Sequence, residues 1–450
     1  MRQTNSLTEK LSQFWIIFFP IFITQLSLTA TSFFDTVMSG NVSQYDLAGV
    51  AIAANLWMPV YTGLNGVIIG ITPILAQMHG AGRQDEMAFV VVQGIYLSAA
   101  ISGMVLLAGF VGIEPLFGAM ALEPRVGEVA RNFIYGLAIG IPPLFASAIL
   151  RNFIEALGYT RVTMLIALGA VMLNVALNYL LIFGQGGFPQ LGGAGAGYAS
   201  AITYWCIFIV SGMVVHKVSP FREYQVFHRL FKVSPAAWKQ QLAIGVPIGL
   251  AIFCEVSIFG VVGLLMAEFG TAIIAAHQAA INFATLVYML PLSIGTALTI
   301  LVGYEAGAGR YRDAGEYSLL GIGVAFLVAV FGAAGLFFFR GQVAALYTTD
   351  PEVHILLETF LLYAVFFQMS DAIAAPIQGA LRGYKDVRAV MGLSMLSYWI
   401  IGMPLGFALA KWMGMGAYGY WLGLIIGLAA GACLLAARLV YRQRHPGIAG

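Results

Sequence analysis

The sequence predicts an all-α integral membrane protein with twelve transmembrane helices in two pseudo-symmetric six-helix lobes. Three observations lead to this prediction: the composition, the number of long uncharged segments, and a repeat between the two halves. Hydrophobic residues make up 60% of the 450 residues and charged residues only 9%, whereas a soluble domain contains about 25% charged residues. A soluble protein with so few charges has no means of covering its surface, so the composition excludes that class.

Twelve segments with few or no charges are long enough to cross a bilayer as helices, which takes about 20 residues each. The first six lie at about 14–38, 50–76, 88–112, 130–150, 162–183 and 193–216, and the second six at about 241–267, 273–302, 317–339, 353–380, 389–410 and 416–437. The longest polar connection, 217–240, separates the two sets. We therefore predict an N-lobe over 1–216, a basic cytoplasmic linker over 217–240 and a C-lobe over 241–450.

The positions of the basic residues predict the orientation of these helices. If the N-terminus is cytoplasmic, 18 of the 22 Lys and Arg residues fall on inner segments and four on outer segments. Cytoplasmic loops of membrane proteins carry such an excess of Lys and Arg. We therefore expect both termini to be cytoplasmic.

The two halves repeat each other at a constant offset. Because six is an even number, both halves enter the membrane in the same direction, and the repeats are parallel. Two parallel lobes are typical of a transporter. The matched positions, each 227 apart, are Pro20 and Pro247, Asn55 and Asn282, Pro124 and Pro351, and the segments 80–83 and 307–310.

Three acidic residues, Asp35, Glu255 and Asp371, lie well inside predicted helices. A charge at membrane depth costs several kcal/mol, and such residues usually face a water-filled cavity and carry function. The alternative is a structural carboxylate that pairs with a neighbouring helix. We expect no Lys or Arg deep enough to serve as that partner.

One candidate ion site lies in the N-lobe. Asp35 in the first helix, Asn174 and Asn178 on one face of the fifth and Ser200 in the sixth are expected at similar depth. Carboxylate, amide and hydroxyl oxygens suit a small hard cation or a proton. Asp35, Asn174 and Asn178 are the candidate ligands of a metal cation. Alternatively, the two Asn residues only form hydrogen bonds between helices.

A second candidate site lies in the C-lobe, where Glu255 and Asp371 are expected near mid-membrane. Two carboxylates in one dry site do not both stay ionised without a bound cation or proton. They are therefore candidates for binding both the cation and the substrate. Gln278, Asn282 and Phe367 are further candidate substrate contacts.

Motifs of other function classes are absent from the sequence. It contains no Gly-Lys dipeptide and therefore no P-loop, and it has no His-Glu-x-x-His or Gly-x-Ser-x-Gly motif. We expect no catalytic residues, no enzyme activity, no cofactor and no nucleic-acid partner. The energy for transport is then expected from an ion gradient or from the gradient of the substrate itself.

The whole chain resembles the multidrug and toxic compound extrusion (MATE) family, in its NorM-like bacterial branch. The specific matches are Phe253-Cys254-Glu255-Val256-Ser257, Ser370-Asp371-Ala372-Ile373, Ala276-His277-Gln278 and Ala380-Leu381-Arg382-Gly383-Tyr384. By this resemblance, Asp35, Asn174 and Asn178 match the N-lobe cation site of such transporters, and Glu255 and Asp371 match the C-lobe carboxylates.

The resemblance implies a monomeric antiporter in the bacterial cytoplasmic (inner) membrane, surrounded by lipid. It would export small cationic or amphipathic organic compounds by alternating access, in exchange for Na⁺ or H⁺. Some Na⁺-coupled relatives have Tyr where this chain has Phe367, which leaves fewer oxygens in the C-lobe. We therefore expect Na⁺ at the N-lobe, with H⁺ as the alternative coupling ion. The alternative functions are a lipid-linked saccharide flippase and a membrane-embedded enzyme.

Overall fold

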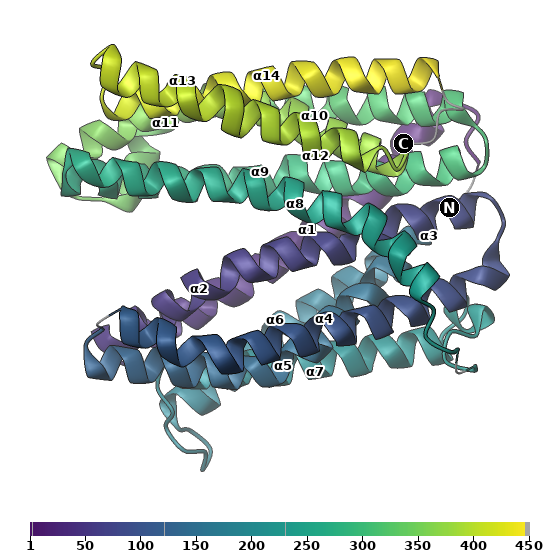
Figure 1. Cartoon of the computed structure of the whole chain (residues 1–450), viewed down its shortest axis with the longest axis horizontal. Coiled ribbons are helices and arrows are strands. Elements are labelled where there is room, and N and C mark those ends of the chain that lie inside the picture. Colours follow the sequence, from purple (N-terminus) through teal and green to yellow (C-terminus); the bar gives the residue numbers. More distant parts are fainter. Residues whose placement is uncertain (2, 121, 230, 446–450) are drawn as a thin grey trace. The chain divides into compact units, whose positions relative to one another are not determined.

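The computed structural model describes residues 1, 3–120, 122–229 and 231–445. All regular elements in these residues are helices, and twelve helical spans are long and apolar enough to cross a membrane (Figure 1). The predicted all-α fold with twelve membrane helices is therefore confirmed. Each predicted segment matches one observed span, and most observed spans extend at least two residues further at both ends.

Most spans are single helices, but three are composite: α2 with α3, α8 with the 3₁₀ turn η2, and α12 to η4, in which η3 and η4 are π-helical. The elements in chain order are α1 (Leu7–Gly40), α2 (Gln44–Ile69), α3 (Ile71–Gly80), α4 (Gln84–Ala119), α5 (Pro124–Ala156), α6 (Thr160–Phe183), α7 (Ala194–Lys217), η1 (Phe221–Tyr224), α8 (Pro235–Met266), η2 (Ala267–Phe269), α9 (Thr271–Gly307), α10 (Tyr311–Tyr347), α11 (Pro351–Gly383), α12 (Val387–Met395), η3 (Leu396–Gly402), α13 (Met403–Phe407), η4 (Ala408–Trp412) and α14 (Ala417–Arg444).

The helix boundaries repeat at the offset found in the sequence. Helices α2, α4, α5 and α6 begin at residues 44, 84, 124 and 160, and α9, α10, α11 and α12 begin 227 positions later in each case. The turns between them repeat as well, since Gly82 and Gly309 have φ values of 71° and 74°. Glycine adopts this left-handed conformation without steric cost. The same local structure is thus built twice.

The chain divides into two compact units. Unit 1 comprises Met1 and Phe19–Val246, and unit 2 comprises Arg2–Phe18 and Pro247–Gly450. The division falls inside α1 and α8, next to Pro20 and Pro247, which are equivalent positions of the repeat. The first turns of α1 therefore pack with unit 2, where Lys10 forms ion pairs of 2.6 Å with Asp313 and 2.5 Å with Glu316.

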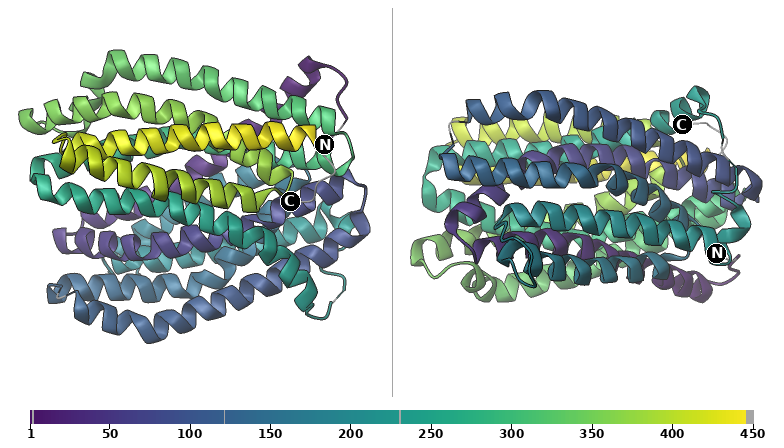
Figure 2. Two further views of the ribbon diagram at one scale, coloured as in Figure 1. Left: turned by 45° about the horizontal axis from the view of Figure 1, so that its top comes forward. Right: turned by 90° about the horizontal axis from the view of Figure 1, so that it is seen from below.

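Close helix contacts hold each unit together. In unit 1, α5 packs between α2 and α7, and in unit 2, α11 packs against α9, α10 and α14. Figure 2 shows α14 lying alongside the span that contains the π-helices. A Cβ on Gly423 of α14 would lie only 2.3 Å from the Cα of Gly406 in α13. Small residues of this kind allow helix backbones to approach in a membrane.

Candidate ion and substrate sites

The structure brings the four predicted N-lobe residues together inside unit 1. The Asp35 carboxylate accepts a 2.7 Å hydrogen bond from Asn178 Nδ2 and a 2.8 Å hydrogen bond from Ser200 Oγ. Asn178 Nδ2 also donates to Asn174 Oδ1 at 3.1 Å, and Asn174 Nδ2 donates to Ser200 Oγ at 3.3 Å. All four side chains are buried. A single polar cluster thus joins α1, α6 and α7.

Local sequence explains how these helices approach each other. Asn174 and Asn178 are four residues apart and therefore lie on the same face of α6. The N-terminal turn of α7 consists of Ala and Gly, and a Cβ on Gly197 would lie 2.2 Å from the carbonyl oxygen of Phe133 in α5. Glycine at this position lets α7 pack closely on α5, and Ser200 follows one turn later. The close packing of α7 therefore sets the position of the Ser200 hydroxyl.

The N-lobe cluster leaves one strong acceptor unused. Within the described residues, Asn178 Oδ1 is buried and has no hydrogen-bond donor. A buried acceptor without a partner costs about 1–3 kcal/mol. Together with the Asp35 carboxylate, this amide oxygen is a hard oxygen donor of the kind that small cations prefer. The set of donors fits a cation such as Na⁺.

The two predicted C-lobe carboxylates also belong to one site, within unit 2. Glu255 of α8 and Asp371 of α11 interact electrostatically with each other. The hydroxyl group of Tyr288 of α9 also interacts with Glu255. The Asp371 side chain is buried, with an exposed fraction of 5%. Two acidic groups so placed attract a cation, because the buried setting strengthens their field.

Among the described residues, no ion pair of 4 Å or less joins a basic side chain to Glu255 or Asp371, and the expectation that these acids have no basic partner stays a prediction. Arg382 lies in the last turn of α11 and interacts electrostatically with Glu255. The helix continues beyond the predicted end at 380, so the residue lies within the span rather than in a loop. Its long side chain reaches back along the helix, where its Nη2 donates a 3.2 Å hydrogen bond to Gln378 Oε1. Within the described residues, this hydrogen bond joins Arg382 to Gln378 and not to either acid.

Among the described residues, no side-chain hydrogen bond or ion pair joins the other predicted substrate contacts to Glu255 or Asp371. Gln278 and Asn282 are exposed on α9, and Asn282 Oδ1 accepts a 3.0 Å hydrogen bond from Tyr347. Phe367 is buried, with edge-on ring contacts to Phe259 and Trp421. For these three residues, the prediction of a substrate contact rests on the sequence alone.

His277 is held by an aromatic neighbour. Trp421 Nε1 in α14 donates a 3.2 Å hydrogen bond to His277 Nδ1, and the His277 side chain is 1% exposed. The ring of Phe360 stacks on Trp421 at a centroid distance of 5.6 Å. The hydrogen bond between Trp421 and His277 therefore joins α14 to α9.

Comparison with known proteins gives a consistent result over the whole chain. A family model described as MatE matches residues 20–180 and 247–408. The "Probable multidrug resistance protein NorM" of Bacillus subtilis strain 168 is 52% identical over 445 residues, which cover 99% of this chain and 98% of that protein. The chain belongs to the MATE family.

Solved structures show the same fold. A structure described as MATE in the bent conformation superposes with a TM-score of 0.89 at 19% identity, over 97% of this chain and 96% of the other. A Vibrio cholerae MATE transporter in the bent form superposes with a TM-score of 0.87 at 17% identity, over 97% and 98%. As a MATE protein, the chain is a multidrug efflux transporter and not an enzyme. It exports small organic compounds across a membrane that it crosses many times.

In this MATE transporter, sequence reasoning missed three residues that interact electrostatically with Glu255: Tyr288, Arg382 and Tyr398. Gln378 and Arg382 follow Asp371 by seven and eleven positions, which places all three on one face of α11. This spacing was visible in the sequence. Tyr398 lies in the π-helix η3 and interacts electrostatically with Glu255 and Asp371. A π-helical turn changes the direction of a side chain in a way that a regular helical period does not predict.

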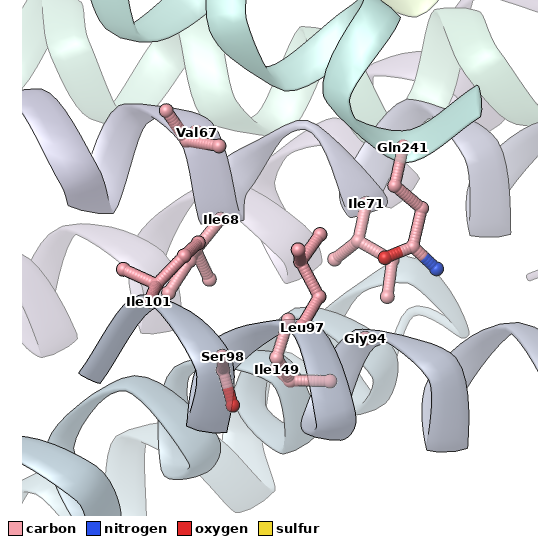
Figure 3. A pocket seen from close by; sticks show the side chains of 9 residues that line it. All are labelled: Val67, Ile68, Ile71, Gly94, Leu97, Ser98, Ile101, Ile149 and Gln241. Carbon is pink, nitrogen blue, oxygen red and sulfur yellow. The ribbon is translucent and has the colours of Figure 1, made fainter. Parts of the chain in front are cut away.

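A small pocket elsewhere in unit 1 of the MATE transporter is not a candidate site (Figure 3). Its lining is apolar except for Ser98 and Gln241, and Gln241 Nε2 donates a 2.9 Å hydrogen bond to the carbonyl oxygen of Val90. It contains none of the predicted site residues. The lining residues are Val67, Ile68, Ile71, Gly94, Leu97, Ser98, Ile101, Ile149 and Gln241.

Proposed function

We propose that this multidrug efflux transporter is a cation-coupled antiporter, which exchanges inward movement of Na⁺ for export of bulky cationic aromatic compounds. The observation that carries this proposal is the pair of interior acidic sites, one in each unit. Asp35 with its amide and hydroxyl neighbours supports ion binding, and Glu255 with Asp371 supports binding of a cationic substrate. H⁺ in place of Na⁺ is one outcome of the test described below.

The donor set around Asp35 supports Na⁺ as the coupling ion. One carboxylate and the free Asn178 Oδ1 offer hard oxygen atoms around a single negative charge. Such a set suits a monovalent hard cation. Both amides are fully buried, so a bound ion would exchange its water for these oxygens. A cation bound there would interact with Asn178 Oδ1, the acceptor that has no hydrogen-bond donor within the described residues.

The site in unit 2 supports a cationic or amphipathic organic substrate. Its carboxylates supply negative charge, and an organic cation is more weakly hydrated than a metal ion and so loses less on entering an apolar interior. Coupling requires only that ion and substrate differ in their affinities for the two conformations of an alternating-access cycle. An incoming cation then favours the conformation that releases the substrate outside.

The proposed setting is the bacterial cytoplasmic (inner) membrane, with the chain as a lipid-embedded monomer and with both termini in the cytoplasm. The placement of 18 of the 22 basic residues on one set of connecting segments supports this orientation. Single exposed cysteines in the 217–240 linker should be labelled by an impermeant thiol reagent only after the membrane is opened. Labelling of intact cells would contradict the orientation.

The test of the exchange uses purified protein in proteoliposomes with a cationic dye as substrate. Na⁺ and pH gradients are imposed separately, and each is dissipated by its own ionophore. We expect dye movement that follows the Na⁺ gradient at clamped pH. Movement that follows only the pH gradient identifies H⁺ as the coupling ion. No gradient-dependent movement of dye by folded protein would overturn the antiport proposal.

A further inference from the structure

The first half of the 217–240 linker is packed onto unit 1 by aromatic side chains. Phe221 of η1 is only 1% exposed and lies edge-on to Phe153 and Tyr159, at centroid distances of 6.4 and 5.2 Å. Tyr224 lies edge-on to Phe153 at 5.4 Å. Phe153 belongs to the last turn of α5, and Tyr159 directly precedes α6. Apolar contacts therefore anchor this half of the linker to the ends of α5 and α6.

The second half of the linker is anchored to α4 by a buried amide. Gln93 Nε2 donates a 2.7 Å hydrogen bond to the backbone carbonyl oxygen of Lys232, and Gln93 Oε1 accepts a 2.9 Å hydrogen bond from the backbone N–H of Ser234. The ring of Phe231 lies edge-on to that of Phe89 in α4, at 5.4 Å. Because the amide uses both its oxygen and its nitrogen on one backbone segment, it fixes the position of that segment.

The linker exposes a group of basic side chains on this anchored backbone. The exposed basic residues are Lys217, Arg222, Arg229, Lys232 and Lys239. Against these five the linker contains one acidic residue, Glu223, so its net charge is +4 with His neutral. Over the described part of the chain, no ion pair of 4 Å or less includes any of the five. Direct ion pairs therefore leave this positive charge uncompensated.

Exposed apolar side chains lie between the basic ones in the linker sequence. Val218, Phe227 and Val233 are 47%, 42% and 55% exposed. At a membrane interface, apolar side chains enter the boundary of the acyl chains while Lys and Arg meet the anionic lipids. A site for a small water-soluble anion has no need of such apolar groups. The loop at the opposite end of α7, 184–193, contains no Lys or Arg.

We propose that the 217–240 linker is a docking surface for anionic phospholipids of the cytoplasmic leaflet. The negative surface potential of that leaflet attracts clusters of basic residues next to membrane helices. Anchoring by Gln93 and by the aromatic contacts keeps the basic groups at the end of unit 1, where lipid headgroups meet the protein. The assignment to the cytoplasmic leaflet rests on the proposed orientation, whereas the preference for anionic lipid rests on the linker alone.

The test measures binding of phosphatidylglycerol and phosphatidylcholine, each labelled on an acyl chain, to the purified full-length transporter in a neutral detergent. Fluorescence anisotropy gives a Kd for each lipid. The proteins are wild type, Arg222→Gln/Arg229→Gln and the conservative variant Arg222→Lys/Arg229→Lys. Arg161→Gln/Arg388→Gln removes two exposed positive charges of α6 and α12 and is the matched control.

We expect the wild type to bind phosphatidylglycerol about ten-fold more tightly than phosphatidylcholine. In Arg222→Gln/Arg229→Gln, the Kd for phosphatidylglycerol should rise about five-fold or more, because two charges next to the headgroups are lost. The conservative variant and the control should keep the wild-type Kd. Added NaCl should raise the Kd of the wild type, because salt screens exposed charges.

Two further measurements separate a lipid surface from a site for soluble phosphate. Phe227→Ser/Val233→Ser should also raise the Kd for phosphatidylglycerol, because it removes the apolar part of the surface. Glycerol phosphate, which has the anionic group without acyl chains, should not displace the labelled lipid at concentrations where unlabelled phosphatidylglycerol does. Displacement by glycerol phosphate, with no effect of the apolar variant, would show a soluble phosphate site and overturn the inference.

Equal Kd values of the wild type for the two lipids would also overturn the inference, and so would an equal rise of Kd in the control. Should Arg222→Gln/Arg229→Gln fail to fold, Lys217→Gln/Lys232→Gln carries the same expectation, and an unchanged Kd in the folded linker variant contradicts it. The measurement uses neither an ion gradient nor a dye. Failure of the antiport proposal therefore leaves the lipid result unaffected.

Discussion

The hydroxyl group of Ser200 donates a 2.8 Å hydrogen bond to Asp35 Oδ2 and so joins α7 to α1 inside unit 1. The bond ends on the carboxylate that carries the charge of the N-lobe cluster. A second serine, Ser39, lies one turn after Asp35 and donates a 2.6 Å hydrogen bond to the backbone carbonyl of Asp35 instead. Both serines are buried, but only Ser200 donates a hydrogen bond to the charged carboxylate.

This difference gives the first prediction. Ser200→Ala should weaken ion-driven efflux and raise the Na⁺ concentration for half-maximal transport, because a hydrogen bond to a charged group is worth about 1.5–3 kcal/mol. Ser39→Ala should leave the Na⁺ dependence near wild type. The measurement is dye efflux from proteoliposomes against Na⁺ concentration at clamped pH. Equal Na⁺ dependence in both variants would argue against ion binding at Asp35.

The second prediction concerns the charge at Asp35 itself. Asp35→Asn removes the charge with little change in volume, and we expect it to abolish the response to Na⁺. Asn178→Ala removes both a donor to Asp35 and the free Oδ1, and we expect a partial loss. The check is transport under an imposed Na⁺ gradient at matched protein amounts. If the Na⁺ response survives unchanged in both variants, the ion binds elsewhere, and Glu255 is the next candidate.

The third prediction concerns the C-lobe acids. Asp371→Asn and Glu255→Gln should each abolish or severely reduce efflux, with expression near normal, because each removes a negative charge from the substrate site. Glu358 is the matched control on α11, since it is an acid on the same helix that pairs with His354 at 3.1 Å. Glu358→Gln should keep export. Drug resistance of cells at matched expression is the assay, and full resistance with both acid variants would refute this role.

The fourth prediction concerns the contact between Trp421 and His277. Trp421→Phe removes the indole donor and leaves His277 Nδ1 buried without a partner, which should destabilise the protein by about 1–3 kcal/mol. Transport per folded molecule should stay close to wild type. Thermal unfolding in detergent and dye efflux are measured on the same preparation. A large loss of transport without a loss of stability would instead support a role for His277 in proton transfer.

The fifth prediction concerns helix packing in unit 2. Gly423→Ala places a Cβ against the backbone of Gly406, and the helices must separate to accept it. We expect a lower unfolding temperature, with a cost of about 1–3 kcal/mol. Gly332→Ala on α10 is the control, because a Cβ there meets nothing within 4 Å. Equal stability of the two variants would show that the close approach of α13 and α14 is not required.

The sequence by itself determined the twelve spans and the internal repeat, because the bilayer demands long uncharged helices and a duplicated chain keeps its spacing. It also predicted that Asp35, Asn174, Asn178 and Ser200 lie together. Burial of a charged or amide group without a partner costs much free energy in an apolar interior. Such groups at equal depth on neighbouring helices are therefore expected to form hydrogen bonds with one another.

Tertiary structure decided which groups surround Glu255 and where Phe367 points. Arg382 lies within the span because α11 continues past the predicted end, and its side chain turns back along the helix to Gln378. Tyr398 interacts electrostatically with Glu255 from a π-helix, and Phe367 turns into an aromatic cluster. Hydropathy and periodicity report how deep a residue lies and on which face of its own helix. The rotation of that helix against its neighbours, and the reach of a long side chain, depend on packing between segments that are far apart in the sequence.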